Sequence, residues 1–173
     1  AGMIQFEMGN IAAAQANFNK ANSMSANNPV VQNNLGAVAL KNGDLKQAEV
    51  YFGAATGAGQ EVNYNKGIVA IKSGDYAAAV NYFGQCNCVN AALANVLAGN
   101  NNEALKKLNA ENKECPMSYY LKAVIGARTN DATAVIENLK KACSLDASFK
   151  QLAATDMEFV KFFENNDFVT ITK

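Results

Sequence analysis

Two stretches of the chain, 31 residues apart, have almost the same pattern. Residues 40–55 read LKNGDLKQAEVYFGAA, and residues 71–86 read IKSGDYAAAVNYFGQC. Each places glycine before aspartate, alanine four residues after the aspartate, and phenylalanine four residues after that alanine. A pattern that returns at a period of about 20–50 residues is the sequence signature of a repeat architecture, in which each unit packs against the next.

The same pattern extends over most of the 173 residues. One position of the period holds a large apolar residue: Phe18, Phe52, Phe83, Leu108 and Leu139. Four residues before it stands a small or β-branched residue, nine before it glycine or asparagine, and sixteen before it glycine or alanine. These are Ala14, Ala48, Ala79, Ala104 and Val135; Gly9, Gly43, Gly74, Gly99 and Asn130; and Gly2, Gly36, Gly67, Ala92 and Ala123.

The pattern has a physical interpretation as pairs of helices. Alanine, which favours helix, is abundant, and proline, which disfavours it, occurs only twice in the chain. Both facts favour helix. Gly43 and Gly74 are expected to end a first helix in the left-handed conformation, where glycine has no steric penalty. Asp44 and Asp75 can then cap the second helix. A small residue at Gly36 lets the two helices approach closely, while the phenylalanines fill the space between hairpins.

These stretches resemble the tetratricopeptide repeat, a helix-turn-helix unit of about 34 residues. The closest matches are residues 33–55 (NNLGAVALKNGDLKQAEVYFGAA) and 63–86 (NYNKGIVAIKSGDYAAAVNYFGQC). The resemblance implies an all-α superhelix forming a single domain over residues 1–173. Its repeats are expected at residues 1–29, 30–59, 60–87, 88–114 and 115–147, followed by a C-terminal capping helix within 148–173.

Two of the predicted repeats are irregular. The spacing from Cys86 to Leu108 is too short for a full linker and a full first helix, so the first helix of the fourth repeat, near residues 90–98, is expected to be short. Repeat 1 lacks the first half of its first helix if Gly2 occupies the small-residue position. We therefore expect a fragment of a longer protein, with a naturally short first helix as the alternative.

The C-terminal segment is expected to cover the last apolar face of the array, as terminal helices do in repeat proteins. Leu152, Phe159, Phe162 and Phe163 are predicted to pack inward, and Phe168 to fold back. The alternative is that this segment is a binding helix.

Composition excludes several classes of function. The chain has no histidine, the residue used most often for acid–base catalysis near neutral pH. Its 15 basic and 15 acidic residues cancel, which argues against nucleic-acid binding. No apolar run reaches the roughly 18 residues of a membrane span. We expect no enzyme, no cofactor and no direct membrane insertion; the alternative of an enzyme would need a site built from tyrosine, lysine and carboxylates.

The cysteines give no convincing metal site, because the spacing in Cys86-Asn87-Cys88 is unusual for zinc and histidine is absent. Free thiols are expected at Cys86, Cys88, Cys115 and Cys143. A disulfide from Cys115 to Cys88 or Cys86 is the alternative, and it would require an oxidising compartment. Two carboxylate pairs, Glu111 with Glu114 and Asp156 with Glu158, are expected to be solvated surface.

The resemblance also implies a ligand groove, because in this family the first helices line the inner surface of the superhelix. The predicted groove residues are Phe6, Asn33, Ala37, Lys41, Tyr64, Ile68, Lys72, Leu93, Tyr120, Val124 and Arg128. Tyr64 and Tyr120 would be amphipathic anchors, and Lys41, Lys72 and Arg128 basic edges. The lysine–asparagine clamp that one subgroup uses to hold a peptide's terminal carboxylate is absent, since its positions hold Asn33, Ala37, Tyr64 and Ile68.

Together these observations predict a non-enzymatic interaction module that binds a partner peptide or domain, or further domains of the same chain. The alternative is a structural spacer or oligomerisation element of a larger cell-envelope protein. The asparagine-rich repeats and the cap are similar to those of bacterial envelope proteins, which favours the periplasm or envelope over the cytoplasm. The sequence does not identify the partner.

Overall fold

The computed structural model describes residues 1–111 and 114–173; residues 112 and 113, within the predicted fourth repeat, lie outside this set. The described residues form helices joined by short turns, with no strand among them, so the prediction of an all-α fold is confirmed. They divide into two compact units, residues 1–84 (unit 1) and 85–173 (unit 2). No helix in the described ranges is both long and apolar enough to cross a membrane.

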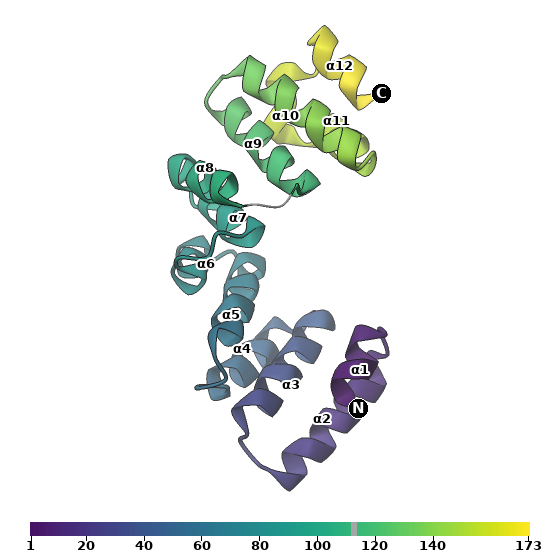
Figure 1. Cartoon of the computed structure of the whole chain (residues 1–173), viewed down its shortest axis with the longest axis vertical. Coiled ribbons are helices and arrows are strands. Elements are labelled where there is room, and N and C mark those ends of the chain that lie inside the picture. The colour runs from purple at the N-terminus through teal and green to yellow at the C-terminus, as the bar shows by residue number, and fades with distance from the viewer. Residues whose placement is uncertain (112–113) are drawn as a thin grey trace. The chain divides into compact units, whose positions relative to one another are not determined.

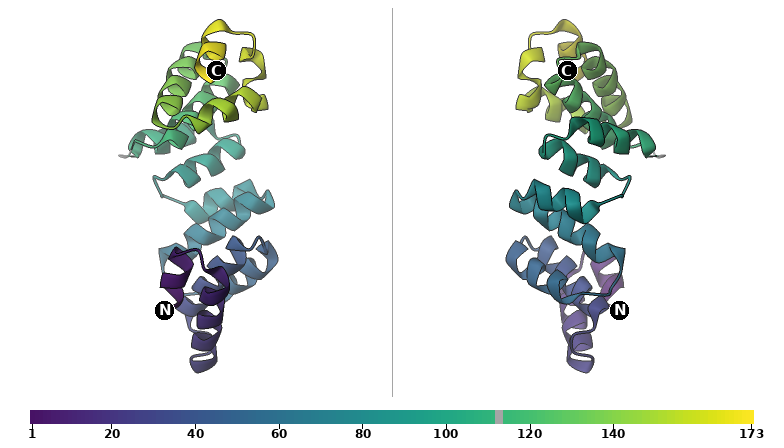
Figure 2. Two further views of the ribbon diagram at one scale, coloured as in Figure 1. Left: turned by 90° about the vertical axis from the view of Figure 1, so that its right-hand side faces the viewer. Right: turned by 90° about the vertical axis from the view of Figure 1, so that its left-hand side faces the viewer.

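Unit 1 consists of three consecutive hairpins of antiparallel helices (Figures 1 and 2). Its helices are α1 (Gly2–Glu7) and α2 (Ile11–Met24), α3 (Pro29–Lys41) and α4 (Leu45–Ala54), and α5 (Gln60–Ser73) and α6 (Tyr76–Phe83).

Unit 2 continues with two hairpins and a terminal segment. Its hairpins are α7 (Val89–Leu97) with α8 (Asn101–Ala110) and α9 (Pro116–Arg128) with α10 (Ala132–Leu145), followed by α11 (Ser148–Thr155), the 3₁₀ helix η1 (Met157–Phe162) and α12 (Asn166–Thr172). Helix α7 has 9 residues, whereas α3 has 13 and α5 has 14. The expected shortening of this first helix is therefore confirmed.

The turns inside the hairpins use the conformation that the spacing predicts. Four of them contain a glycine with φ between +78° and +81°, and in the fifth Asn130 has φ +57°. The Asp44 carboxylate accepts a hydrogen bond from the backbone N–H of Gln47 at 3.0 Å, and Asp75 accepts one from Ala78 at 2.9 Å. Each aspartate therefore satisfies a backbone donor that the first turn of its helix leaves unpaired.

Within each hairpin of unit 1, a glycine on the first helix lies against a phenylalanine on the second. A Cβ atom built on Gly36 would lie 2.5 Å from Cε1 of Phe52, which is fully buried. On Gly67 it would lie 2.7 Å from Cζ of Phe83. The corresponding positions of unit 2 hold alanine with leucine, and all four residues are buried in one apolar cluster: Ala92, Leu108, Ala123 and Leu139. The small-residue position is thus matched to the size of its partner.

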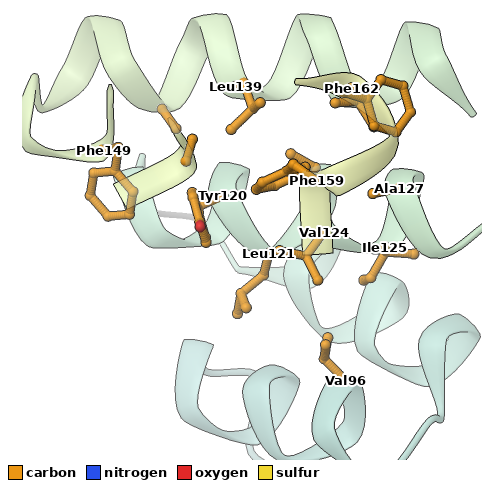
Figure 3. Close-up of a cluster of buried hydrophobic side chains, with 14 of the residues drawn as sticks. Val96, Tyr120, Leu121, Val124, Ile125, Ala127, Leu139, Phe149, Phe159 and Phe162 are labelled. Atoms are coloured by element: carbon orange, nitrogen blue, oxygen red, sulfur yellow. The ribbon is translucent and has the colours of Figure 1, made fainter. Parts of the chain in front are cut away.

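The terminal segment closes unit 2, but as three short helices rather than one capping helix. Phe159 and Phe162 are buried as predicted, and Phe168 folds back so that its ring centroid lies 5.7 Å from that of Phe159. Figure 3 shows Phe159 inside the apolar cluster of this unit. The prediction for Leu152 is wrong, since its side chain is 44 % exposed.

The cysteine predictions are wrong for one pair. A disulfide joins Cys86 to Cys88, which the sequence analysis expected either to be free or to pair with Cys115. Cys115 and Cys143 are free, and burial raises the pKa of the Cys143 thiol. Cys86 and Cys88 lie in the link between α6 and α7. The backbone there does not have the helical conformation that would point the two side chains in different directions.

Candidate functional site

The predicted groove residues of unit 1 lie mainly on α3 and α5, the first helices of two neighbouring hairpins. Tyr64, Ile68 and Lys72 recur every four residues along α5, which places them on one side of that helix. Ala37 and Lys41 have the same spacing on α3. We call these five residues the first-helix face of unit 1.

Asn33, the remaining predicted contact on α3, has a structural role instead. It is only 7 % exposed, and its Oδ1 accepts a hydrogen bond from Nδ2 of Asn65 on α5 at 3.0 Å. The pair links the first helices of two hairpins through side chains that would cost free energy if buried without partners. The sequence analysis missed Asn65, although a second asparagine about one period after Asn33 is a signal that could have identified it.

Two lysines give the first-helix face its charge. Lys41 and Lys72 are exposed and belong to the last turns of α3 and α5. Among residues 1–111 and 114–173, no ion pair or hydrogen bond engages either amine. A cation near a helix C-terminus is stabilised by the helix dipole, yet both amines keep their capacity to bind an anion.

The other residues of this face are apolar or amphipathic. The Tyr64 side chain is 38 % exposed, and its ring meets the ring of Phe83 edge to face with centroids 5.5 Å apart. Ile68 and Ala37 are half-buried. Phe6 on α1 is also half-buried, but it packs against the apolar cluster of the first two hairpins. The face therefore combines apolar surface with two cations.

In unit 2 the predicted groove residues are covered. Tyr120 is 5 % exposed and Val124 is 4 % exposed, so the expectation that they form an open groove surface is wrong. Both lie in the apolar cluster with Phe159 of η1 (Figure 3). The Tyr120 hydroxyl donates a hydrogen bond to Oδ2 of Asp156 at 2.6 Å, and burial followed by this carboxylate raises the pKa of the phenol well above its usual range.

Arg128, the third predicted groove residue on α9, is also occupied. Its guanidinium binds both carboxylate oxygens of Glu158, with Nε lying 2.9 Å from Oε2, and it donates to the Val96 carbonyl of α7. The hydrogen bond to Glu158 raises the pKa of Arg128. The expectation that Asp156 and Glu158 are merely solvated is therefore wrong. Leu93, on α7, is half-buried against the same apolar cluster.

The 3₁₀ helix η1 thus occupies the side of α9 that carries Tyr120, Val124 and Arg128. Phe159 packs with Tyr120 in the apolar cluster that also contains Val124. Asp156 accepts a hydrogen bond from Tyr120, and Glu158 binds Arg128. The sequence analysis predicted the cap but not which residues it would cover.

A pocket of about 300 Å³ lies between α4 and α6, on the side of α5 opposite to the first-helix face. Lys66 and Val69 line it from α5, Gly53 from α4 and Tyr82 from α6. The Lys66 amine lies 6.0 Å from the centroid of the Tyr82 ring, a cation–π geometry. No groove residue predicted from the sequence lines this pocket.

Comparisons with known proteins agree with this architecture. Residues 1–28 and 60–90 match the family model of the tetratricopeptide repeat. No curated protein matches the chain. Among solved structures, the chain is similar to the crystal structure of YrrB, described as a TPR protein with an unusual peptide-binding site. The TM-score is 0.67 at 19 % sequence identity, over 84 % of this chain and 83 % of that one. Two segments of the chain thus match the tetratricopeptide repeat, and its fold is similar to that of a solved TPR protein.

Proposed function

We propose that the chain is a protein-interaction module whose unit 1 binds a segment of a partner protein along its first-helix face. The observation that carries the proposal is a contrast between the first helices of the two units. On α9 the groove positions are covered by the chain's own cap, whereas on α3 and α5 Lys41 and Lys72 stay exposed beside half-buried apolar side chains.

The two segments that match the tetratricopeptide repeat support the proposal. Tetratricopeptide repeat proteins are generally non-enzymatic scaffolds, and we propose the same for this chain. Stacked repeats create extended surfaces that suit protein ligands. The TPR protein of similar fold is itself described as having a peptide-binding site. A tyrosine beside apolar surface is suited to partner recognition, because aromatic residues are enriched at interfaces.

A displayed library of random peptides, selected on the full chain, would test this proposal. Peptides that bind should lose at least about tenfold in affinity for the double variant Tyr64→Ala, Lys72→Ala, since removal of interface anchors costs about 1–2 kcal/mol or more. The matched control is Lys66→Ala, Tyr82→Ala. It removes a half-buried lysine of α5 that lines the pocket and a tyrosine of α6 whose exposure, 42 %, is similar to that of Tyr64.

The proposal predicts that the control variant binds the selected peptides as the unchanged protein does. Selected peptides that bind both variants equally, or that lose affinity only for the control, would show that the first-helix face is not the site.

A further inference from the structure

The first helices α5 and α9 carry the same classes of residue at the same positions. Each has a tyrosine three residues before its small residue, a β-branched aliphatic residue one after it, and a base five after it. On α5 these are Tyr64, Ile68 and Lys72 around Gly67, and on α9 they are Tyr120, Val124 and Arg128 around Ala123. The side of α5 with Tyr64, Ile68 and Lys72 and the side of α9 with Tyr120, Val124 and Arg128 therefore carry similar residues in the same order.

For α9 the structure shows what such a surface binds. The segment Asp156-Met157-Glu158-Phe159 lies over it. Asp156 accepts the Tyr120 hydroxyl, the Glu158 carboxylate binds Arg128, and the ring of Phe159 lies 5.6 Å from that of Tyr120 in an edge-to-face arrangement. Acidic and aromatic side chains from η1 and its N-cap residue thus bind the tyrosine and the arginine on one side of a first helix.

We propose that the first-helix face of unit 1 binds a segment of a partner protein with the same acidic and aromatic chemistry, Asp-x-Glu-Phe. The inference rests on the proposed function and specifies its ligand. The aromatic ring packs on Ile68 and the exposed part of the Tyr64 ring, while the second carboxylate pairs with Lys72. Lys41, in the last turn of the neighbouring first helix, supplies a second cation for acidic residues that flank the motif.

Charge decides against other partner segments. The five residues of the face include Lys41 and Lys72 and no carboxylate, while Glu61 lies in the first turn of α5, at the other end of the helix from Lys72. A basic segment beside the two lysines would bring like charges together. A purely apolar segment would cover the two amines without replacing the hydrogen bonds they make to water, which has a free-energy cost. Lysine is a point charge without the planar fork of arginine, so the pairing with Lys72 is expected to be weaker and less strictly oriented than that of Arg128 with Glu158.

The chain's own covering segment provides the probe. A capped synthetic peptide, acetyl-Thr-Asp-Met-Glu-Phe-Val-amide, reproduces residues 155–160. Its neutral control replaces the aspartate by asparagine and the glutamate by glutamine. Added to the isotopically labelled full chain, the acidic peptide should shift the backbone amide signals of α3 and α5 saturably. It should bind about three- to tenfold more tightly than the neutral peptide, since each exposed charge pair contributes a factor of up to about five.

Charge reversal at one position makes the test specific. The variant Lys72→Glu should lower the affinity for the acidic peptide about tenfold and should bind the neutral peptide at least as well as the acidic one. Lys46→Glu, at another exposed lysine that lies on α4 and outside the face, should change the affinity less than about twofold. Lys41→Glu serves as a second reporter if the first variant unfolds more easily.

Three results would overturn the inference. The two peptides could bind equally, the shifts could appear around the pocket lined by Gly53 and Tyr82, or they could appear in α9 because the peptide exchanges with the cap. If library peptides bind the first-helix face but the acidic peptide does not, the ligand chemistry is wrong while the proposed function stands.

Discussion

At the scale of single residues, the size of one side chain determines what its neighbour can be. Glycine at position 36 leaves room for the fully buried ring of Phe52, with no space for even one more carbon atom. Where the smaller Leu139 replaces the ring, alanine is accommodated at Ala123. The two combinations fill comparable space in a close-packed interior.

Gly36→Ala should therefore destabilise the protein even though alanine favours helix. Overpacking of a buried site costs about 1–3 kcal/mol, which exceeds the gain in helix propensity of about 1 kcal/mol. Adding Phe52→Leu should recover part of this loss by removing the clash. Urea denaturation followed by circular dichroism measures the unfolding free energies.

Gly53→Ala is the control, since a Cβ atom there meets nothing within 4 Å and the residue is in the same hairpin. It should leave stability unchanged or raise it by up to about 1 kcal/mol. Equal effects of the two single substitutions would contradict the packing explanation.

At the scale of helices, each second helix begins in one of two ways. Asp44, Asp75 and Asp131 cap their helices with a side-chain hydrogen bond, whereas Asn10 and Asn100 stand at the same position without one. The aspartates should therefore contribute more to the stability of the helices that they begin.

Asp44→Ala should lower the unfolding free energy by about 0.5–2 kcal/mol, the usual effect of removing a capping side chain. Asn100→Ala should have a smaller effect, because the hydrogen bond from its side chain to Asn95 is long, at 3.5 Å, and does not cap the helix. Thermal unfolding of both variants compares them. Equal losses would mean that the cap geometry does not control stability.

The contact between α9 and η1 gives a pH dependence. The Tyr120 phenol keeps its proton in the folded state above the pKa of about 10 that it has when unfolded. Its contribution is therefore complete below about pH 10, and stability falls above it by up to about 1.4 kcal/mol per pH unit. Tyr120→Phe should lose about 1 kcal/mol near neutral pH and show a shallower decline between about pH 10 and 11. Urea unfolding across that range measures the difference, and identical slopes would contradict it.

Features set by local chemistry could be predicted from sequence, and features set by distant contacts could not. The turn conformation at Gly43 and the burial of Phe52 follow from requirements within one hairpin. The covering of Tyr120 depends on where a segment about 36 residues later lies, and a tyrosine at a groove position looks the same whether covered or open. The Cys86–Cys88 disulfide depends on the conformation of the link between α6 and α7, which the spacing of the two cysteines does not determine.

At the scale of the whole molecule, the two units differ in what covers their first helices. Unit 2 covers α9 with its own C-terminal residues, whereas Lys41 and Lys72 of unit 1 remain exposed. The boundary between the units falls next to the Cys86–Cys88 disulfide. The proposed interaction therefore depends on unit 1, while the contacts of η1 serve the stability of unit 2.

The matched sizes at the hairpin crossings also bear on how such a chain can evolve. A substitution of either member of a glycine–phenylalanine pair alone lowers stability, so we expect related proteins to have changed both residues together or neither. The hairpins of unit 2, which have alanine and leucine at these positions, show that the alternative pair is already present in this molecule. Covariation between these two columns, when related sequences are aligned, would record the constraint across lineages.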